Sequence, residues 1–319
     1  MCKRSQLDYM DTYNDDIHKI EEGLNRLNDK EYISESTINF FRDIIRAQYK
    51  VKKQLGEIKI STCLTEEKVK EMMINGKPLI SWDDIPLKES SLKELFREIC
   101  GIIKKQENSE TGEVQRLIDA ESEGTITLDI LIKKLFSHDN VYFHSLARDI
   151  KVGEELLLFV ALHIARPFFE AVAAKLNDRV MDELWIKNRC PVCGSEAQIA
   201  KLEKEVGKKM LTCLLCGSEW RFMRVKCPFC NNEDNKSLKF LEVEGSPYRI
   251  DICKKCKRYI KTLDERKGGD EKREFIPSIE DLATMYLDVV AEKEGYERSW
   301  FFPPSVDEPK AGTKSKVLH

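Results

Sequence analysis

Eight of the eleven cysteines lie in four Cys-x-x-Cys pairs between residues 190 and 256, and this clustering constrains the fold more than any other feature. None of the five histidines falls within this window. A Cys-x-x-Cys turn can place two sulfurs on one metal ion, and two such turns complete a tetrahedral site of four thiolates. The pattern predicts two metal ions per chain, held by Cys190, Cys193, Cys213, Cys216, Cys227, Cys230, Cys253 and Cys256.

The spacing of the pairs indicates which of them share a metal. Residues 197–202 and 209–212 read as two strands around a turn at Gly207, and residues 238–243 and 248–252 as two strands around the sequence EGSP. Each hairpin would join two consecutive Cys-x-x-Cys turns into one ribbon, as in zinc ribbons and rubredoxin. The first two pairs would then hold one metal and the last two pairs the other. An interleaved arrangement, first pair with third and second with fourth, remains open.

Zinc and iron both suit such sites. Zinc is the usual ion of a structural four-cysteine site, and a tetrahedral shell of four sulfurs also binds a single iron. The turns Cys-Pro-Val-Cys-Gly and Cys-Pro-Phe-Cys occur in rubredoxin knuckles and in zinc ribbons alike. A redox Cys-x-x-Cys of the thioredoxin type requires a βαβ setting, which the sequence around these pairs lacks.

The first half of the chain reads as helical. Apolar periodicity predicts helices over 6–28, around 38–49, and over 66–74, 90–105, 113–120, 128–136, 142–150 and 154–176. The last of these is apolar almost all round and is expected to be the central buried helix, with a kink at Pro167. A late helix is expected from Ser278, with Asp281 in a capping box, to a stop at Gly295.

The predicted fold class is therefore α+β: an all-helical N-terminal domain, two rubredoxin-like or zinc-ribbon four-cysteine modules, and a late packing helix. The expected boundaries are 1–186 for the helical domain, 187–226 for the first ribbon and 227–267 for the second. Residues 268–302 would pack on the ribbons as a C-terminal helix. Residues 303–319 have nothing to bury and are expected to be disordered.

Charge and hydropathy exclude several classes of protein. The net charge is only −3, with 53 Lys+Arg and 56 Asp+Glu. Residues 190–273 carry 19 Lys+Arg against 13 Asp+Glu, and eight thiolates around two divalent ions reduce that excess to about +2. We therefore expect no nucleic-acid binding. The most apolar run, 156–165, contains His163 and is shorter than the roughly 18 residues of a membrane span, so we expect no membrane insertion and a cytoplasmic location.

The segments NRCPVCGSEAQI, CLLCGSEWRFMRVKCPFC, YRIDICKKCKRYIKTLDE and DLATMYLDVVAEKEGYERSWFF resemble the formate dehydrogenase accessory protein FdhE family. The resemblance runs from about Trp185 to Phe302 and includes residues other than the cysteines. It implies a helical domain followed by two rubredoxin-like modules, with which iron has been associated. It also implies a cytoplasmic role in producing active respiratory formate dehydrogenase, through contact with the catalytic subunit before export by the twin-arginine route.

Three functions follow as hypotheses. The first is a maturation or assembly factor, not itself an enzyme, that binds the formate dehydrogenase catalytic subunit through a metal-rigidified double ribbon. The second is a zinc-ribbon protein that binds nucleic acid. The third is an iron redox protein that passes an electron to the client enzyme.

Four residues outside the cysteines are candidates for contact with the partner: Trp220, Arg224, Tyr259 and Lys261. Trp220 is expected in the core where the two ribbons meet. Tyr259 and Lys261 would line a cleft between ribbon and helix, or else serve ordinary packing and carry a solvated charge.

Arg224 and His163 each have two interpretations. Arg224 would either pair with Asp281 or Asp288 of the late helix or contact an acidic segment of the partner. His163, on an apolar helix, is expected to be a satisfied core histidine and not a metal ligand.

Overall fold

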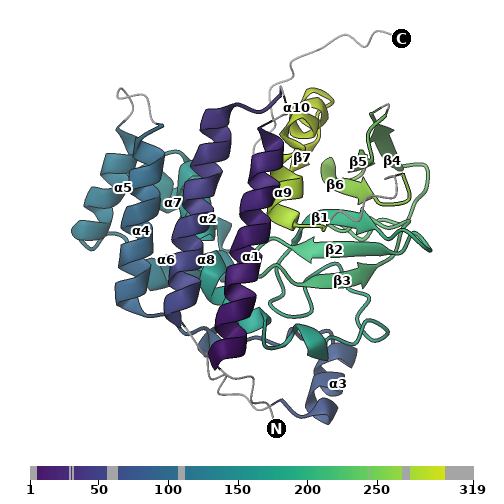
Figure 1. The fold of residues 1–319 in the computed structure, drawn as a ribbon, viewed down its shortest axis with the longest axis horizontal. Coiled ribbons are helices and arrows are strands. Elements are labelled where there is room, and N and C mark those ends of the chain that lie inside the picture. Colours follow the sequence, from purple (N-terminus) through teal and green to yellow (C-terminus); the bar gives the residue numbers. More distant parts are fainter. Residues whose placement is uncertain are drawn as a thin grey trace.

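Most helices and the strands occupy opposite sides of the molecule in the computed structural model (Figure 1). The structure describes residues 6–28, 30, 32–55, 64–106, 112–243, 245–267 and 274–298, without the side chains of residues 6–14. The expected tail 303–319 lies outside the described residues. The helical part comprises α1 (Gln6–Leu27), α2 (Glu35–Leu55), α3 (Glu66–Ile74), α4 (Glu89–Lys104), α5 (Glu113–Ser122), α6 (Leu128–Phe136), α7 (Asn140–Ile150) and α8 (Glu154–Ala173), with 3-10 turns at Trp82–Asp84 and Asn177–Arg179.

The central helix is α8, which contacts α2, α4, α6 and α7. Its length and composition would allow it to cross a membrane, so the expectation that no segment is long and apolar enough was wrong. However, 83% of its most apolar window is buried inside the protein, as in the core helix of a globular domain. Charged side chains such as Arg166 and Glu170 interrupt the apolar sequence, so no uninterrupted apolar stretch in it reaches the length of a membrane span.

A seven-stranded sheet forms the other side of the molecule, in the order β3-β2-β1-β6-β5-β4 with β7 beside β6. Its strands are β1 (Ala197–Leu202), β2 (Lys209–Cys213), β3 (Glu219–Phe222), β4 (Leu238–Glu242), β5 (Tyr248–Cys253), β6 (Arg258–Asp264) and β7 (Glu297–Arg298). The two expected hairpins are the antiparallel pairs β1–β2 and β4–β5. The α+β class with two four-cysteine groups is confirmed.

One pairing turns the two ribbons into a single sheet. β1 and β6 run parallel, with Ala200 opposite Thr262 and Leu202 opposite Asp264. The stretch 217–226, between the second and third Cys-x-x-Cys pairs, contains β3, which pairs with β2. The two four-cysteine modules therefore belong to one continuous hydrogen-bonded sheet.

The late helix is in fact two helices, α9 (Pro277–Leu282) and α10 (Met285–Lys293). The expected cap at Ser278 was wrong, because Pro277 already occupies the first turn and Ile276 stands at the N-cap without a side-chain hydrogen bond. Proline suits the first turn, where its missing N–H has no helical partner. Thr284 separates the two helices, and its hydroxyl donates to the carbonyls of Glu280 and Asp281.

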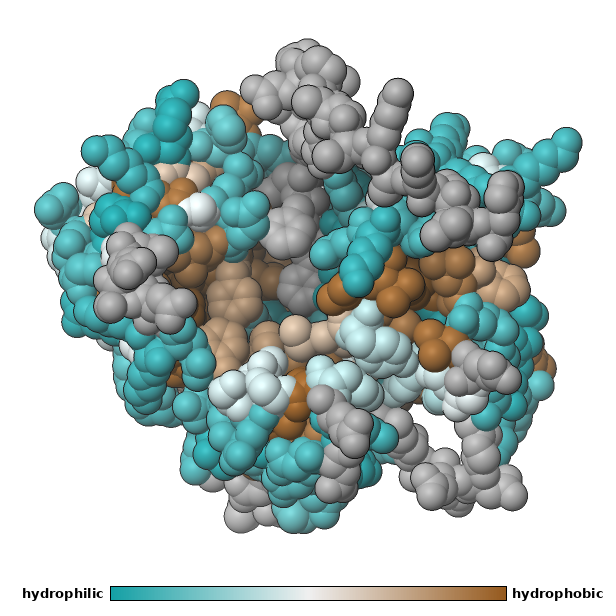
Figure 2. Space-filling model, turned by 90° about the horizontal axis from the view of Figure 1, so that it is seen from above, coloured by the Kyte–Doolittle hydropathy of each residue, from teal (hydrophilic) through white to brown (hydrophobic). Residues whose placement is uncertain are grey.

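The two late helices connect the halves of the molecule (Figure 1). Helix α9 packs against α1 so closely that a Cβ built at Gly23 would lie 3.0 Å from Cγ1 of Ile279. Helix α10 packs on β5, where Leu287 and Ala291 are buried in a small core. Seen from above, apolar surface is visible on both sides of the molecule (Figure 2). Helix α10 also exposes Val289 and Val290.

Candidate metal centres

All four Cys-x-x-Cys turns adopt the same backbone conformation. In each, the residue after the second cysteine has a positive φ, and its N–H donates to the carbonyl of the first cysteine over 2.9–3.2 Å. These residues are Gly194, Gly217, Asn231 and Lys257. Glycine adopts this conformation without strain, whereas Asn and Lys do so at a cost. In the first module, glycine occupies both positions with a positive φ. In the second module, Asn231 and Lys257 adopt the same backbone conformation although they carry side chains.

The turns bring the eight sulfurs into two groups of four, one from the first two pairs and one from the last two. Across the pairs, the Sγ atoms of Cys190 and Cys216 lie 3.5 Å apart and those of Cys193 and Cys213 lie 3.4 Å apart. In the second group the corresponding distances are both 3.7 Å. A tetrahedral ion with metal–sulfur bonds of about 2.3 Å requires sulfurs about 3.8 Å apart. The groups thus fit a four-thiolate metal ion, and the grouping is consecutive and not interleaved.

Backbone amides support the sulfurs in both groups. The N–H groups of Val192 and Cys193 point at Sγ of Cys190, and those of Leu215 and Cys216 point at Sγ of Cys213, at 3.4–3.5 Å. In the second group the N–H of Phe229 donates to Cys227 over 3.4 Å. Such donors stabilise thiolate charge next to a metal.

The thiols of each group cannot all ionise without a cation. Burial raises the pKa values of Cys190 and Cys193. Burial opposes ionisation of Cys213 too, but hydrogen bonds from its three neighbours outweigh it and lower its pKa. In the second group the hydrogen bond from Cys256 lowers the pKa of Cys227 to about 5, while the pKa of Cys256 is raised. A divalent ion would allow all four cysteines of a group to bind as thiolates.

The first group is built into the helical part. Its four cysteines belong to the same apolar core as α8. The loop before the first 3-10 turn runs along the first knuckle, where Leu79 N donates to the carbonyl of Pro191 over 3.0 Å and Ile80 N to that of Val192 over 2.8 Å. A Cβ at Gly194 would lie 2.9 Å from Cγ of Pro78, so this glycine allows the close approach.

The second group lies nearer the surface, with Cys230 and Cys256 only partly buried. A cavity of about 300 Å3 adjoins it, lined by Cys227, Cys253 and one carboxylate, that of Asp251. Six cationic side chains also line the cavity: Lys209, Arg224, Lys226, Lys239, Arg249 and Arg258. Part of this positive charge offsets the double negative charge that four thiolates around a divalent ion would carry.

Three of the four candidate partner residues are buried. Trp220 is fully buried on β3, an edge strand away from the junction of the two ribbons, and its Nε1–H donates to the carbonyl of Lys187 over 3.1 Å. Tyr259 and Lys261 are each 1% exposed. Arg224 is exposed and lines the cavity beside the second group.

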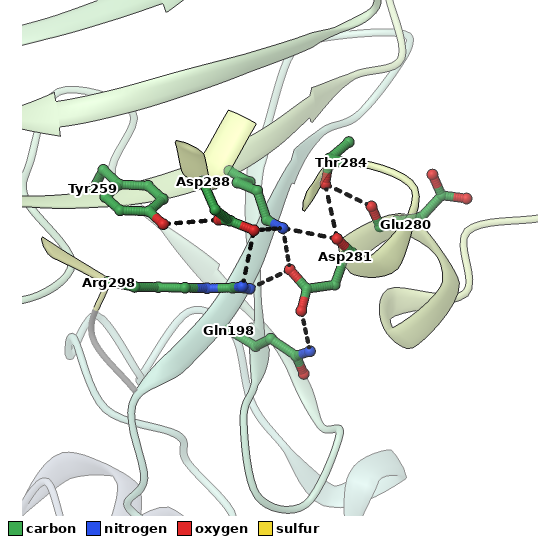
Figure 3. A network of polar contacts seen from close by, with 8 residues as sticks. Gln198, Tyr259, Glu280, Asp281, Thr284, Asp288 and Arg298 are labelled. Atoms are coloured by element: carbon green, nitrogen blue, oxygen red, sulfur yellow. Dashed lines mark hydrogen bonds and ion pairs between the residues drawn. The ribbon is translucent and has the colours of Figure 1, made fainter. Parts of the chain in front are cut away.

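Tyr259 and Lys261 form a polar network with the late helices (Figure 3). Lys261 Nζ lies 2.7 Å from Asp281 Oδ1 and 2.8 Å from Asp288 Oδ2, and the Tyr259 hydroxyl donates to Asp288 over 2.8 Å. Burial would raise the pKa of Asp281, but the charges of Arg298 and Lys261 outweigh it and lower the pKa to about 2. The network therefore links β6 to α9 and α10 through buried ion pairs and hydrogen bonds.

The second cation of this network is Arg298, which pairs with both Asp281 and Asp288. From the sequence, an ion pair of Arg224 with one of these two carboxylates was expected, and Arg298 was not identified as a partner. No local pattern marks Arg298, because β7 reaches the network only by pairing with β6. The ion-pair interpretation of Arg224 was therefore wrong.

Comparison with known proteins shows that this chain is similar to FdhE proteins in sequence and in fold. Residues 225–303 match the family model "FdhE, C-terminal domain". Over 268 residues the chain is 27% identical to the Protein FdhE homolog of Aquifex aeolicus, covering 82% of this chain and 86% of that protein. It is 37% identical over 122 residues to the Protein FdhE homolog of Pectobacterium carotovorum, covering 36% and 38%.

The chain resembles the FdhE family over most of its length. The crystal structure of the FdhE protein from Pseudomonas aeruginosa matches the fold with a TM-score of 0.61 and 18% identity, over 92% of this chain and 96% of that one. The match to the FdhE C-terminal domain covers the second cysteine group together with α9 and α10.

Proposed function

We propose that this FdhE-like chain is a cytoplasmic accessory factor for formate dehydrogenase, which binds the catalytic subunit and is not itself an enzyme. One observation carries the proposal: the segment that matches the FdhE C-terminal domain holds a four-cysteine group with the cationic cavity beside it. Metal binding would hold the knuckles in one shape, so little conformational freedom would be lost on association.

The residues that would bind the metals are the eight cysteines. Cys190, Cys193, Cys213 and Cys216 would hold one ion in the buried group, and Cys227, Cys230, Cys253 and Cys256 the other in the partly exposed group. The ions, zinc or iron, would supply rigidity to the knuckles.

The docking surface we propose is the cavity beside the second group. Arg224 lines it and is exposed, whereas Trp220, Tyr259 and Lys261 would act indirectly, by holding the sheet and the late helices in place. Six cations and one carboxylate line it, and Lys209 and Arg249 already pair with that carboxylate. Arg224 and Lys239 form no ion pair among the described residues, which favours an acidic segment of the partner.

A pull-down with the catalytic subunit tests the proposal. The wild-type chain should retain the subunit, Cys227→Ser with Cys230→Ser should abolish retention, and Arg224→Ala should weaken it several-fold. Arg221→Ala is the matched control, because Arg221 is also exposed but lies outside the cavity. Tight, salt-sensitive binding of a DNA or RNA duplex without any subunit binding would replace the proposal with the nucleic-acid function.

The partial exposure of Cys230 and Cys256 favours a second candidate, a one-electron redox role if the second site holds iron. An oxygen-free preparation would then show thiolate-to-iron absorption that bleaches on reduction and returns on oxidation. A zinc content of two per chain with no such absorption would leave the accessory role without a redox step.

A further inference from the structure

A second cavity, of about 280 Å3, lies between the helical part and the C-terminal part of the chain. Helices α2 and α8 form one wall, and β1, α9, α10 and β7 form the other. Gly217, next to the first cysteine group, also lines it, and a Cβ there would have no described atom within 4 Å. Neither the metal sites nor the proposed docking surface accounts for this cavity.

The wall that α8 contributes is a polar stripe on an otherwise apolar core helix. His163, Arg166 and Glu170 all line the cavity, and their spacing of three and four residues places them on one face. Polar groups at the centre of an apolar core are costly unless they are hydrogen-bonded. The protein supplies some of these partners, namely Gln48 for His163 and Lys52 for Glu170, and the donors that remain are available to a ligand.

Two buried atoms of the lining residues have no hydrogen-bond partner among the described residues: His163 Nε2 and Gln198 Oε1. His163 is 6% exposed and Gln198 is 5% exposed. The amide of Gln48 lies 3.1 Å from His163 Nδ1, which assigns the hydrogen of the neutral ring to Nε2. The Nδ1 side is thus satisfied as expected for a core histidine, and an N–H donor is left over.

Arg166 has further unused donors. Its Nε lies 3.2 Å from Glu170, and Glu170 is shared with Lys52 at 3.1 Å. Within the described part of the chain, neither terminal nitrogen of the Arg166 guanidinium forms an ion pair, although the side chain is only 11% exposed. Two N–H-bearing nitrogens in one plane match the geometry of a carboxylate.

The nearby carboxylates do not oppose an anion. Glu170 lies between two cations, and Asp281 and Asp288 each contact both Lys261 and Arg298. The remaining lining is largely apolar: Ile20, Phe41, Ile44, Ile45, Leu282 and Met285. The cavity thus combines unused N–H donors with an apolar enclosure.

We propose that this cavity binds a small carboxylate, whose oxygens accept hydrogen bonds from Arg166 and from His163 Nε2 and whose body packs on the apolar wall. A hydroxyl on the ligand would donate to Gln198 Oε1. Because both halves of the molecule line the cavity, the ligand stabilises their contact, and the melting temperature rises with its concentration.

Three probes of similar size test the chemistry: propionate, lactate, which adds a hydroxyl, and propionamide, which lacks the charge. Calorimetry and thermal melting of the full metal-loaded chain, at constant ionic strength, should show binding of both carboxylates and none of the amide. Lactate should bind several-fold more tightly than propionate, and Gln198→Leu should remove that preference. Carboxylate binding should also shift the ¹⁵N signal of His163 Nε2.

Arg166→Gln should lower carboxylate affinity at least tenfold while leaving two metals per chain. Arg148→Gln, at an exposed arginine of α7, is the matched control. Should Arg166→Gln fold poorly, Arg166→Lys, which keeps the charge but loses the planar donor pair, should still weaken binding. Equal binding of propionate and propionamide, unchanged binding in both Arg166 variants, or no binding at millimolar concentration would overturn the proposal and leave a water-filled cavity. Subunit pull-down tests the accessory function separately.

Discussion

The two cysteine groups use one backbone turn in two different settings. The first group is buried on all four cysteines and shares its core with α8. The second has two partly buried cysteines and a cationic cavity beside it. The same set of four cysteines therefore stands in two environments: the first group forms part of the main core, whereas the second lies near the surface beside the cavity. We expect the two sites to differ in stability, in exchange rate and in the consequences of mutation.

The largest effect should come from changing Cys190 and Cys193 together to Ser. One metal should be lost and one retained, and the free energy of unfolding should fall by more than about 5 kcal/mol, since structural zinc sites supply roughly 10–16 kcal/mol in isolated peptides. Metal analysis and urea denaturation measure both. Cys227→Ser with Cys230→Ser is the matched control, with a smaller loss. Loss of both metals, or of neither, would contradict consecutive pairing.

Lys261→Met should destabilise the second module next most strongly. The substitution leaves the buried Asp281 and the half-buried Asp288 with Arg298 as their one ion-pair partner among the described residues, and breaking such a network costs about 3–5 kcal/mol. Thermal melting should show the second site releasing its metal at a lower temperature than the first. Lys239→Met, at an exposed lysine of β4, should change stability by less than about 0.5 kcal/mol. If both variants changed stability equally, the network would not be what stabilises the second module.

The turns themselves allow a direct comparison. Gly194→Ala should cost about 1–3 kcal/mol, because alanine is strained at a positive φ and its Cβ would meet Pro78. Asn231→Gly, at the equivalent place in the second module, should be neutral or stabilise by less than about 1 kcal/mol. Chemical denaturation of the metal-loaded variants measures both. A stabilised Gly194→Ala protein would refute the shared turn geometry.

The smallest expected effect is kinetic. A chelator should remove the metal of the second site at least about tenfold faster than that of the first, a difference of about 1.4 kcal/mol in barrier. The reason is access, because Cys230 and Cys256 are partly exposed and the first group is not. Time-resolved metal release from the wild-type chain measures the two rates. The double variant Cys227→Ser with Cys230→Ser, which lacks the second site, shows which rate belongs to which site. A single release rate would show that both sites open together.

Local features of this molecule could be predicted from its sequence. Residues 66–74 form a helix with Thr65 as its cap and Gly76 after its end, because caps and glycine act over a few residues. The grouping of the cysteines followed from two hairpins, each of which is also local.

Long-range features could not be predicted. The parallel pairing of β1 with β6 joins segments separated by a complete module, and no turn residue encodes it. The sequence also suggested Arg224 where Arg298 is the partner of Asp281 and Asp288. Neither arginine belongs to a local motif, and only the three-dimensional sheet brings Arg298 to the two carboxylates. The burial of Lys261 likewise depends on α9 and α10 covering β6.

The contact between Gly23 and Ile279 has a consequence for synthesis on the ribosome. Helix α1 is translated long before α9, which covers one part of its surface. Helix α2 covers part of the apolar face of α1 soon after synthesis, but at roughly 5–20 residues per second the part that faces α9 stays uncovered for many seconds. β1 likewise waits for β6. The contacts of α1 with α9 and of β1 with β6 can therefore form only after the segments between them have been synthesised, so the two halves of the molecule join late in folding.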